Sequence, residues 1–487
     1  MPDDPQAAPG SDGADDVEVK AEAVTTSRGN RGRGARGAGR DLTTGSVPKN
    51  LWHLAWPQVI EGILQVADQM VDLVWAGRLP GGFRSVASVG VAQTFSQFAV
   101  MGRQGFDQAM RAMISRAVGA NNVPLANHVA LQAFTLSTAY SVIMVFVGFF
   151  LTDVFLRLLG ASDALQAETA MYMRIQFIGA ASQAFRMMGG GALQAAGDVI
   201  TPMKATLLSR VIHIILTPFL MFGWWGFPHL GLAGAALSNV IAQLIPCVII
   251  YYALFKGTSR LKLSLQGFRL DFPVIWRIVK IGTPASIGGT ERAVGQLVLM
   301  GLVSPFGDVA LAGYAITRRV EMVANFASMG LGNASGIMVG QNLGANRPDR
   351  ARQSIGWALV YVVTMKAVAG GIIALFAGAI VMIFTSDPEV VELTTFWLRI
   401  QMIAAVVQGL SLVFNQSFNT AGDTLAPMLV ILAGMWLVEV PLAWSLIHYT
   451  GLGPVAIAYA AIAGFSARII VYIPYFFAGR WTRVKVI

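Results

Sequence analysis

The residues in this sequence that are best placed to do chemistry are acidic side chains inside an apolar stretch. Glu61, Asp68 and Asp72 lie between Leu51 and Gly77, among large aliphatic and aromatic residues. At about 100° per helical residue the three fall within about 40° of arc, so a helix would carry them as one stripe. Carboxylates held away from water bind protons or cations, because their ionised form is costly there. We therefore expect Asp72, Asp68 and Glu61 to hold a proton or a cation.

The acidic stripe also has a purely structural explanation. Arginines on neighbouring helices, such as Arg103 or Arg111, would neutralise it through salt bridges. Arg103, Asp107 and Arg111 themselves follow at i, i+4 spacing, which predicts an ion-paired ladder on one helix. The sequence leaves both explanations of the stripe open.

Amide side chains form a second pattern, and this pattern occurs twice. Gln176, Gln183 and Gln194 match Gln401, Gln408 and Asn419 at one constant spacing. Amide side chains inside a membrane either hydrogen-bond neighbouring helices to each other or line a cavity. For each of these residues taken alone, both alternatives remain open. Their duplication favours a shared cavity. The expected lining residues are Gln65, Gln183, Gln408, Asn415, Asn419, Glu291 and His213.

Apolar stretches of membrane-spanning length must position these residues. Hydrophobic residues make up 55% of the 487 residues and charged residues 13%, with a mean hydropathy of +0.60, values outside the range of soluble domains. Crossing the hydrocarbon takes about 20 helical residues. Twelve such stretches cover 51–77, 85–114, 127–151, 165–195, 203–222, 230–254, 274–303, 309–339, 354–383, 390–419, 425–447 and 454–477. The sequence therefore predicts an all-α integral membrane protein with twelve transmembrane helices.

Internal repetition organises these stretches into two units. Gly119-Ala120-Asn121 recurs as Gly344-Ala345-Asn346, and Ala196-Gly197-Asp198 recurs as Ala421-Gly422-Asp423, both at the spacing that relates the amides. This constant spacing is called the repeat offset below. Chance matches would scatter in spacing, so the chain is a duplication. Each unit holds six helices and enters the membrane in the same sense, which predicts parallel repeats around a central site.

Basic residues concentrate at positions that flank the membrane on one side. They are Arg28, Arg31, Arg33, Arg36, Arg40, Lys49, Lys256, Arg260, Lys262, Arg269, Arg277, Lys280, Arg347, Arg350, Arg352, Arg480, Arg483 and Lys485. The positive-inside rule makes this side cytoplasmic, with both termini there, although Arg78, Arg84 and Arg157 fall on the other side. This distribution indicates a lipid bilayer as the partner and no nucleic acid.

Five segments follow from these patterns. Residues 1–46 lack large apolar side chains and are predicted to be a disordered cytoplasmic tail. The other segments are an N-lobe over 47–255, a basic cytoplasmic linker over 256–273, a C-lobe over 274–478 and a cytoplasmic C-terminal tail over 479–487. The single Cys247 excludes an intrachain disulfide, and no phosphate-binding loop, HExxH or GxSxG occurs. We expect no enzyme and no cofactor.

Several motifs resemble those of one family, the multidrug and toxic compound extrusion (MATE) transporters, particularly the branch like the DNA-damage-inducible exporters. The resemblance runs from about Lys49 to the C-terminus. It rests on Pro57 with Val71-Asp72 and Ala76-Gly77, on Ala195-Ala196-Gly197-Asp198 with Thr201-Pro202, on Leu232-Ala233-Gly234-Ala235-Ala236 and on Val339-Gly340-Gln341-Asn342-Leu343-Gly344-Ala345. The family implies twelve helices in two lobes, alternating access, and export driven by inward movement of H⁺ or Na⁺.

The resemblance also implies roles for particular residues. Asp72 matches the carboxylate that the family uses for cation coupling. Other family positions differ, because His213 and Thr217 replace an Asn and an Asp, and Gln408 replaces an Asp of another branch. A Glu of that branch is shifted to Glu291. We therefore favour H⁺ over Na⁺ as the coupling ion.

These expectations combine into one functional hypothesis with two rivals. The hypothesis is a secondary active, cation-coupled antiporter of the plasma membrane, monomeric, that exports small organic compounds of cationic or amphipathic character. The first rival is a flippase for a lipid-linked saccharide, which should have a strongly cationic cavity where the acidic stripe lies. The second is a non-transporting membrane scaffold, which would not need duplicated polar stripes in mid-membrane.

Overall fold

Backbone polar groups inside hydrocarbon must hydrogen-bond within their own segment, and the chain accordingly folds into helices. The computed structural model describes residues 40–79, 82–158, 163–484 and 486, and these ranges contain no β-strand. The first half holds α1 (Val47–Ala76), α2 (Gly82–Gly119), α3 (Val123–Leu158), α4 (Asp163–Ala195), α5 (Ile200–Phe222) and α6 (Leu232–Lys256). The second holds α7 (Phe272–Val303), α8 (Gly307–Gly344), α9 (Pro348–Leu375), α10 (Ala377–Met382), α11 (Pro388–Ala421), α12 (Leu425–Ala433), α13 (Val440–Tyr449) and α14 (Ala456–Ala478).

Two of the twelve predicted spans are interrupted helices. The predicted span 354–383 consists of α9 and the short α10, and the span 425–447 consists of α12 and α13 joined by the π-helical turn Gly434–Glu439. By length and hydropathy alone, eight segments of the described residues qualify as membrane spans, one of which runs over both α7 and α8. Helices α1, α2 and α4, which carry charged residues within their length, are not among them. The all-α architecture is confirmed.

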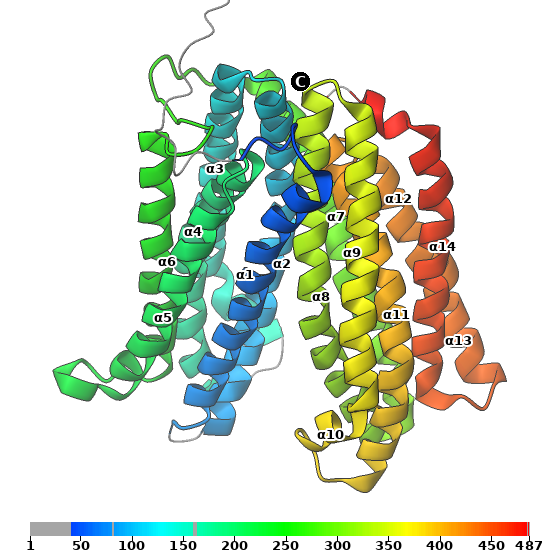
Figure 1. Ribbon diagram of the computed structural model, residues 1–487. Coiled ribbons are helices and arrows are strands. Elements are labelled where there is room, and N and C mark those ends of the chain that lie inside the picture. Colours follow the sequence, from blue (N-terminus) through cyan, green and yellow to red (C-terminus); the bar gives the residue numbers. More distant parts are fainter. Residues whose placement is uncertain (1–39, 80–81, 159–162, 485, 487) are drawn as a thin grey trace, which may run out of the picture. The chain divides into compact units, whose positions relative to one another are not determined.

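The helices of the two halves form two groups with a shared interface. In Figure 1 the blue to green helices α1 to α6 lie on one side and the helices from α7 to α14 on the other. Between the groups, α1 packs against α8 and α2 packs against α7, and α2 also crosses α8. The α1–α8 and α2–α7 pairs are equivalent when the two halves are exchanged, as the predicted parallel duplication requires.

The backbones of the two halves approach closely where α2 crosses α8, at the end where the C-terminus lies, here called the terminal end (Figure 1). A Cβ added to Gly119 would lie 2.0 Å from the carbonyl oxygen of Gln341, and one added to Gly344 would lie 2.1 Å from that of Arg116. Only glycine permits backbones to approach this closely. Because Arg116 and Gln341 are also related by the repeat offset, the crossing is symmetric.

Two side-chain hydrogen bonds lock this crossing at nearly equivalent positions, since their donors are related by the repeat offset and their acceptors deviate from it by one residue. Arg116 donates from Nη2 to the carbonyl oxygen of Ala421 at 2.7 Å, and Gln341 donates from Nε2 to that of Ala195 at 2.7 Å. Each bond runs from one half to the other and satisfies a carbonyl near a helix C-terminus, which has no partner within its own helix. Arg116, Gly119, Gln341 and Gly344, with the carbonyls of Ala195 and Ala421, are called the clasp below.

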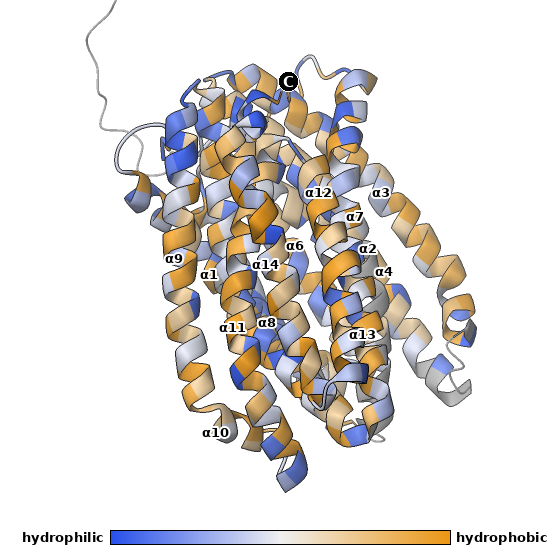
Figure 2. Cartoon of the chain, turned by 90° about the vertical axis from the view of Figure 1, so that its right-hand side faces the viewer, coloured by the Kyte–Doolittle hydropathy of each residue, from blue (hydrophilic) through white to orange (hydrophobic). Residues whose placement is uncertain are grey.

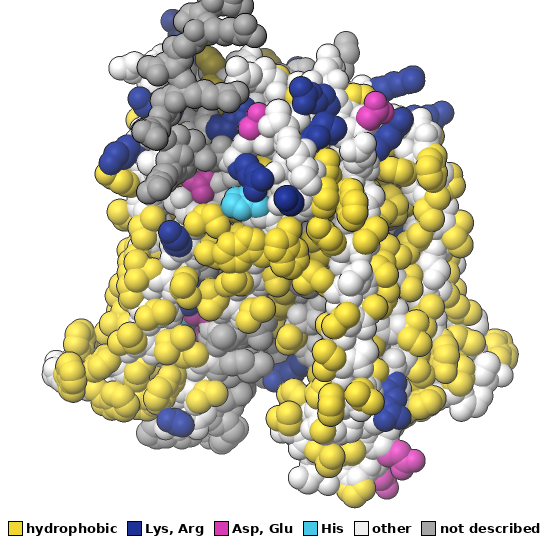
Figure 3. Space-filling model, in the orientation of Figure 1, with side chains coloured by type: hydrophobic (Ala, Val, Ile, Leu, Met, Phe, Trp, Pro, Cys, Tyr) yellow, Lys and Arg dark blue, Asp and Glu magenta, His cyan; other side chains and the backbone are white. Residues whose placement is uncertain are grey.

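The surface has the polarity of a membrane-embedded bundle. Hydrophobic residues cover the middle of the helices in Figure 2, and hydrophilic residues gather toward the terminal end. Figure 3 shows a broad hydrophobic band, with Lys and Arg side chains concentrated on the terminal end above it. Basic side chains are also visible in the hollow between the two halves at the opposite end (Figure 3). The described residues of the helical part thus carry the charge asymmetry that the sequence predicts.

The predicted N-terminal tail needs a correction. Its residues 1–39 lie outside the described residues, but residues 40–46 are packed rather than disordered. Leu42 is fully buried, and Arg347 donates from Nη1 to the carbonyl oxygen of Thr43 at 2.6 Å. A segment without an apolar run can still be ordered when arginines of the folded part bind its carbonyls. Residues 40–46 are called the terminal segment below.

Candidate functional site

Three cavities meet around one residue between the two halves. The central chamber, of about 220 Å³, is lined mainly by α2, α7, α11 and α12. The N-chamber, of about 160 Å³, is lined by α1, α2, α4, α5 and α8, and the C-chamber, of about 350 Å³, by α7, α8, α11, α12 and α14. Met329 on α8 lines all three. The size of the C-chamber is within the range of small-molecule sites, roughly 300 to 1,000 Å³.

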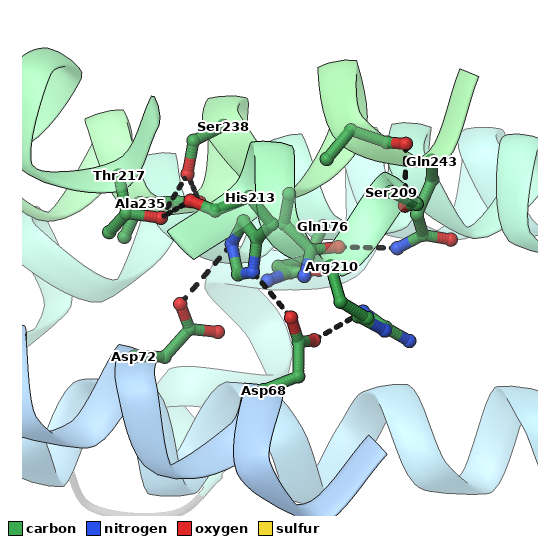
Figure 4. Close-up of polar contacts among 12 residues, drawn as sticks. Asp68, Asp72, Gln176, Ser209, Arg210, His213, Thr217, Ala235, Ser238 and Gln243 are labelled. Carbon is green, nitrogen blue, oxygen red and sulfur yellow. Dashed lines mark hydrogen bonds and ion pairs between the residues drawn. The ribbon is translucent and has the colours of Figure 1, made fainter. Parts of the chain in front are cut away.

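Four ionisable side chains form a buried cluster between α1 and α5 (Figure 4). Asp68 and Asp72 lie one turn apart on α1, while Arg210 and His213 lie one turn apart on α5, so each pair projects from one face of its helix. Asp68 binds Arg210 through Oδ2 and His213 Nδ1 through Oδ1, the latter at 2.7 Å. These four residues are called the Asp–His cluster. Asp68 is thus neutralised by an arginine of a neighbouring helix, as the structural explanation of the stripe requires, but this arginine is Arg210 of α5 rather than Arg103 or Arg111.

Asp72 and His213 face each other across a gap in this cluster. His213 Nε2 lies 3.4 Å from Asp72 Oδ1, and neither atom has a hydrogen-bond partner among the described residues. If His213 donates its Nδ1 proton to Asp68, its Nε2 presents a lone pair to a carboxylate, and the two repel. One added proton between the two atoms would turn this repulsion into a hydrogen bond. With Arg210 charged and both carboxylates ionised, that proton also brings the cluster from a net charge of −1 to neutrality.

Glu61, the third member of the acidic stripe, occupies a different environment. It lines the N-chamber with Arg111 and Arg186, and Gln194 donates from Nε2 to its Oε2 at 3.5 Å. Part of the predicted ladder on α2 is confirmed, because Arg103 binds both carboxylate oxygens of Asp107 at 2.8 Å. Arg111 instead faces the N-chamber, and among the described residues no carboxylate oxygen lies within 4 Å of it.

Ion pairs in the second half surround the C-chamber. Arg318 binds Glu321 at 2.6 Å, and Arg468 binds Glu439 at 3.2 Å. Glu321 also accepts a hydrogen bond from Gln401 Nε2 at 3.2 Å. Gly434, in the π-helical turn after α12, makes room for Arg468, because a Cβ added to this glycine would lie 2.5 Å from the Arg468 side chain.

Glu291 and Arg292 form no salt bridge among the described residues, although their adjacency in the sequence suggests such a pair. Glu291 lines a lateral cavity between α2, α7 and α12, whereas Arg292 lines the central chamber and the C-chamber. Neighbours in a helix point about 100° apart, so adjacent residues readily serve different cavities. Arg292 has no carboxylate oxygen within 4 Å among the described residues.

Comparison with known proteins adds the decisive observation. The family model MatE matches residues 57–219 and, a second time, residues 285–445, together more than half of the chain. The chain belongs to the MATE family. The two matches fall on the two halves that the repeat offset defines.

Individual relatives agree with this family over most of their length. The chain is 26% identical to the probable multidrug resistance protein YoeA of Bacillus subtilis, over 86% of this chain and 91% of that one. It is 23% identical to the FAD transporter of Shewanella oneidensis, over 82% and 88%. Among solved structures, a MOP superfamily transporter of Pyrococcus furiosus superposes with a TM-score of 0.84 at 20% identity, over 91% and 98%. A multi-pass membrane transporter, not an enzyme, follows from this membership.

The predicted lining residues of this MATE protein are distributed over several cavities. Gln65 lines the N-chamber, Gln408 the C-chamber, Asn419 the central chamber, and Asn415 both of the latter two. Gln183 lines a separate cavity of about 10 Å³ within the first half. His213 is fully buried in the Asp–His cluster instead of lining a chamber, and Glu291 lies in the lateral cavity. Gln183 and Gln408 therefore do not line one shared cavity.

Arginine dominates the charged lining of the MATE cavity, although the sequence patterns point first to acids and amides. The three chambers are lined by Arg111, Arg186, Arg210, Arg292, Arg318, Arg319 and Arg468, and by the acidic residues Glu61 and Glu321. A signal for these arginines exists, because each stands inside an apolar stretch, where a charge normally faces a cavity or a partner. Their partners could not be assigned without the packing of the helices.

Proposed function

We propose that this MATE protein is a secondary active exporter in which the Asp–His cluster exchanges a proton between the two sides of the membrane. The observation that carries the proposal is the gap between Asp72 Oδ1 and His213 Nε2, two facing buried atoms that lack a hydrogen bond among the described residues. The cluster touches the cavity through Arg210, which binds Asp68 and also lines the N-chamber. Proton binding at the cluster can therefore act on the wall of the cavity.

The physical basis is a difference in proton affinity between two conformations. In the present conformation the clasp holds α2 against α8 at the terminal end. If the cluster binds a proton more tightly in one conformation than in the other, a proton gradient shifts the population between them. The chambers then open alternately to the two sides of the membrane, so that a small organic compound bound in them is released on the other side. The coupling ion is the only additional component that this proposal requires, and no cofactor takes part.

The occupied oxygens of Asp68 favour H⁺ over Na⁺. A sodium ion needs several free oxygen ligands, but Arg210 and His213 already take both carboxylate oxygens of Asp68. A proton needs only the gap between Asp72 and His213. Asp72, Asp68 and His213 are therefore proposed as the coupling residues, and Glu61 as a wall residue of the N-chamber.

The location follows from the charge distribution. We place the chain in the plasma membrane as a monomer, with the terminal end in the cytoplasm, because Lys and Arg concentrate there. Relatives are named as multidrug resistance proteins and, in one instance, as an FAD transporter, so small organic compounds are the proposed substrate class. The expected cationic character of the substrate rested on the acidic stripe, and that stripe is largely neutralised by Arg210 or turned toward Arg111 and Arg186.

The test of this proposal replaces the titratable carboxyl group of Asp72 by an amide of the same shape. Asp72→Asn, reconstituted in vesicles, should lose transport driven by a pH gradient by at least about tenfold, because the amide cannot take up the proton. Rhodamine 123 and carboxyfluorescein, two xanthene dyes of opposite charge, serve as probes. Asp153→Asn is the matched control, since Asp153 forms a solvent-exposed pair with Arg174 outside the cluster. Undiminished proton-driven transport by Asp72→Asn would overturn the proposal.

A further inference from the structure

The charges that line the chambers are unbalanced. Seven arginines and two glutamates line the three chambers. Charged groups inside a membrane protein are costly and persist where a partner or a ligand compensates them. The question is which of these arginines the protein itself compensates.

Ion pairs account for three of the seven. Arg210 binds Asp68, Arg318 binds Glu321 and Arg468 binds Glu439. Among the described residues no carboxylate oxygen lies within 4 Å of the other four arginines, which are Arg111, Arg186, Arg292 and Arg319. In the first half, Glu61 lies in the same chamber as Arg111 and Arg186 and offsets part of their charge. In the second half, the C-chamber of Arg292 and Arg319 contains one glutamate, which Arg318 holds, and Glu291 next to Arg292 faces the lateral cavity instead.

The excess positive charge is therefore greatest in the C-chamber. Arg292 enters it from α7, where it also borders the central chamber, and Arg319 enters it from α8. Behind the wall, the fully buried Lys366 adds a further cation, which donates from Nζ to Asn325 Oδ1 at 2.6 Å. Asn325 and Gln408 supply amides to the same chamber. A guanidinium without a partner and neighbouring amide N–H groups are the donors that bind carboxylates and phosphates.

We infer that the C-chamber binds the anionic group of an organic substrate, a carboxylate or a phosphate, with Arg292 as its main contact and Arg319 as a second one. The inference rests on the proposed export function and specifies the substrate class. It reverses the expectation of a cationic substrate, because that expectation counted only the acids of α1. The cavity walls are also partly apolar, with Phe465 and Met322 in the C-chamber, which suits an anion attached to an apolar or aromatic body.

The position of this chamber also constrains coupling. The C-chamber is lined by α7, α8, α11, α12 and α14, and the Asp–His cluster lies on α1 and α5. Proton and anion thus occupy different halves and do not compete for one group. Their exchange then depends on the movement of the halves rather than on direct displacement.

The experiment compares the two xanthene dyes on the full-length protein in nanodiscs. Carboxyfluorescein, the anion, should bind more tightly than rhodamine 123, the cation, as measured by fluorescence anisotropy. Arg292→Gln should raise the Kd of carboxyfluorescein by about 10- to 100-fold, since a charge-assisted bond is lost, and should leave rhodamine 123 unchanged or better bound. Arg292→Lys, which keeps the charge, should restore most of the affinity. Arg174→Gln, at the exposed pair with Asp153, is the control.

A second variant protects the test against misfolding. Arg319→Gln should change the two affinities in the same directions by a smaller factor, because Arg319 is one of several cations around the chamber. Binding of rhodamine 123 as tight as that of carboxyfluorescein, with both dyes equally insensitive to Arg292→Gln and Arg319→Gln, would overturn the inference. Proton-driven transport of rhodamine 123 alone would also overturn it while leaving the proposed export function intact. Proton-driven transport of neither dye would instead count against the proposed function.

A further experiment with added lipid distinguishes the two possible sources of the anion. The same phosphate chemistry occurs in a lipid head group and in a soluble organic phosphate. In nanodiscs of phosphatidylcholine, added phosphatidylglycerol should not displace carboxyfluorescein if the chamber serves soluble anions. Displacement that Arg292→Gln abolishes would assign the same site to a lipid head group, and displacement independent of Arg292 would contradict the assignment of the site.

Discussion

The clasp and the chambers differ in how the two halves of the chain contribute to them. At the clasp, residues related by the repeat offset make the same kind of contact. Gly119 and Gly344 each pack against the backbone of the other half, and Arg116 and Gln341 each donate a hydrogen bond to a carbonyl of the other half. The charged residues that line the chambers are not repeated in this way. The repeat offset relates Asp68 and Asp72 to the apolar residues Ala293 and Leu297.

This difference separates two tasks. Closing one end of a two-fold assembly requires the same contact on both sides of the axis, so both copies must keep the same small residues and turns. The backbone shows this directly, because Asn121 and Asn346 both adopt a φ of 58°, and Gly197 and Gly422 adopt 94° and 96°. Proton exchange and ligand binding need only one site each. One half can therefore hold the Asp–His cluster and the other the anion site.

The largest effect should come from breaking the clasp. Gly119→Ala places a methyl group 2.0 Å from the backbone oxygen of Gln341, and Gly344→Ala places one 2.1 Å from that of Arg116. Relief of either overlap requires α2 and α8 to separate. Overpacking typically costs about 1 to 3 kcal/mol, so we expect proton-driven dye transport to fall by about tenfold or more for each variant.

The symmetry of the clasp makes a more specific prediction than loss of transport alone. Because the crossing is symmetric, the two alanine variants should be equally impaired, within about twofold, which corresponds to about 0.4 kcal/mol. Gly356→Ala, on α9, is the control, since its added Cβ has no atom within 4 Å. In a Cys247→Ala background, Thr420→Cys next to the crossing should also become reactive to a hydrophilic thiol reagent from the terminal end. Normal transport by Gly119→Ala together with loss of transport by Gly344→Ala would refute the symmetric clasp.

An intermediate effect is expected from the terminal segment, which has no counterpart in the second half. Asp41 pairs with Arg260 after α6 at 3.4 Å, and the carbonyl of Thr43 binds Arg347 after α8, so the segment joins both halves. Deletion of residues 1–44 should lower the melting temperature, because burial of Leu42 alone contributes about 1.5 to 3 kcal/mol.

A shorter truncation separates this contribution from that of the preceding residues. Deletion of residues 1–39 removes none of the described contacts and should leave the melting temperature unchanged. Composition alone predicts a disordered tail over 1–46, and on that prediction the longer deletion would not change the melting temperature either. Equal melting temperatures for the two truncations would restore that prediction.

The fold could be predicted from the sequence because it depends on patterns that are local or repeated. Apolar length indicates the helices, and the constant repeat offset indicates the two halves, including the turns that flank the clasp. Partners are harder to predict, because they depend on how each helix is rotated. Salt bridges to arginines such as Arg103 or Arg111 are one of the two explanations that the sequence leaves open for the acidic stripe. In the structure, Arg103 is held by Asp107 on its own helix, and Asp68 is reached from α5.

The amides illustrate the same limit. Gln183 and Gln408 are correctly placed as repeat equivalents, yet each lines a cavity within its own half. Equivalent positions share depth in the membrane, but the surrounding side chains decide whether a cavity forms. In the first half Arg103 and Tyr140 border the small cavity of Gln183, whereas in the second half Gln408 borders a chamber of about 350 Å³.

The smallest effect should come from an unrepeated contact at the terminal end, where the linker before α7 is fastened to α3. Asp271 caps α7 by accepting from the Val274 N–H at 3.2 Å, and its other oxygen lies 2.9 Å from His128 Nε2. The bond from His128 and then that from Val274 hold the pKa of Asp271 below its ordinary value of 3.8. A carboxylate with a lowered pKa in the folded state stabilises the protein above its ordinary pKa, and this stabilisation is lost as the pH falls through the lowered value.

Asp271→Asn should therefore cause a small decrease in melting temperature between about pH 5 and 8, because asparagine still caps the helix but lacks the carboxylate charge that His128 and Val274 stabilise. The difference from the wild type should shrink as the pH falls below about 4. Asp387→Asn is the matched control, since Asp387 caps α11 at 2.9 Å from the Glu389 N–H and has no histidine partner among the described residues. Dye transport should be unchanged in both variants, because neither Asp271 nor Asp387 takes part in the clasp. A transport defect in Asp271→Asn with a normal melting temperature would instead show that closure of the terminal end depends on an asymmetric contact as well.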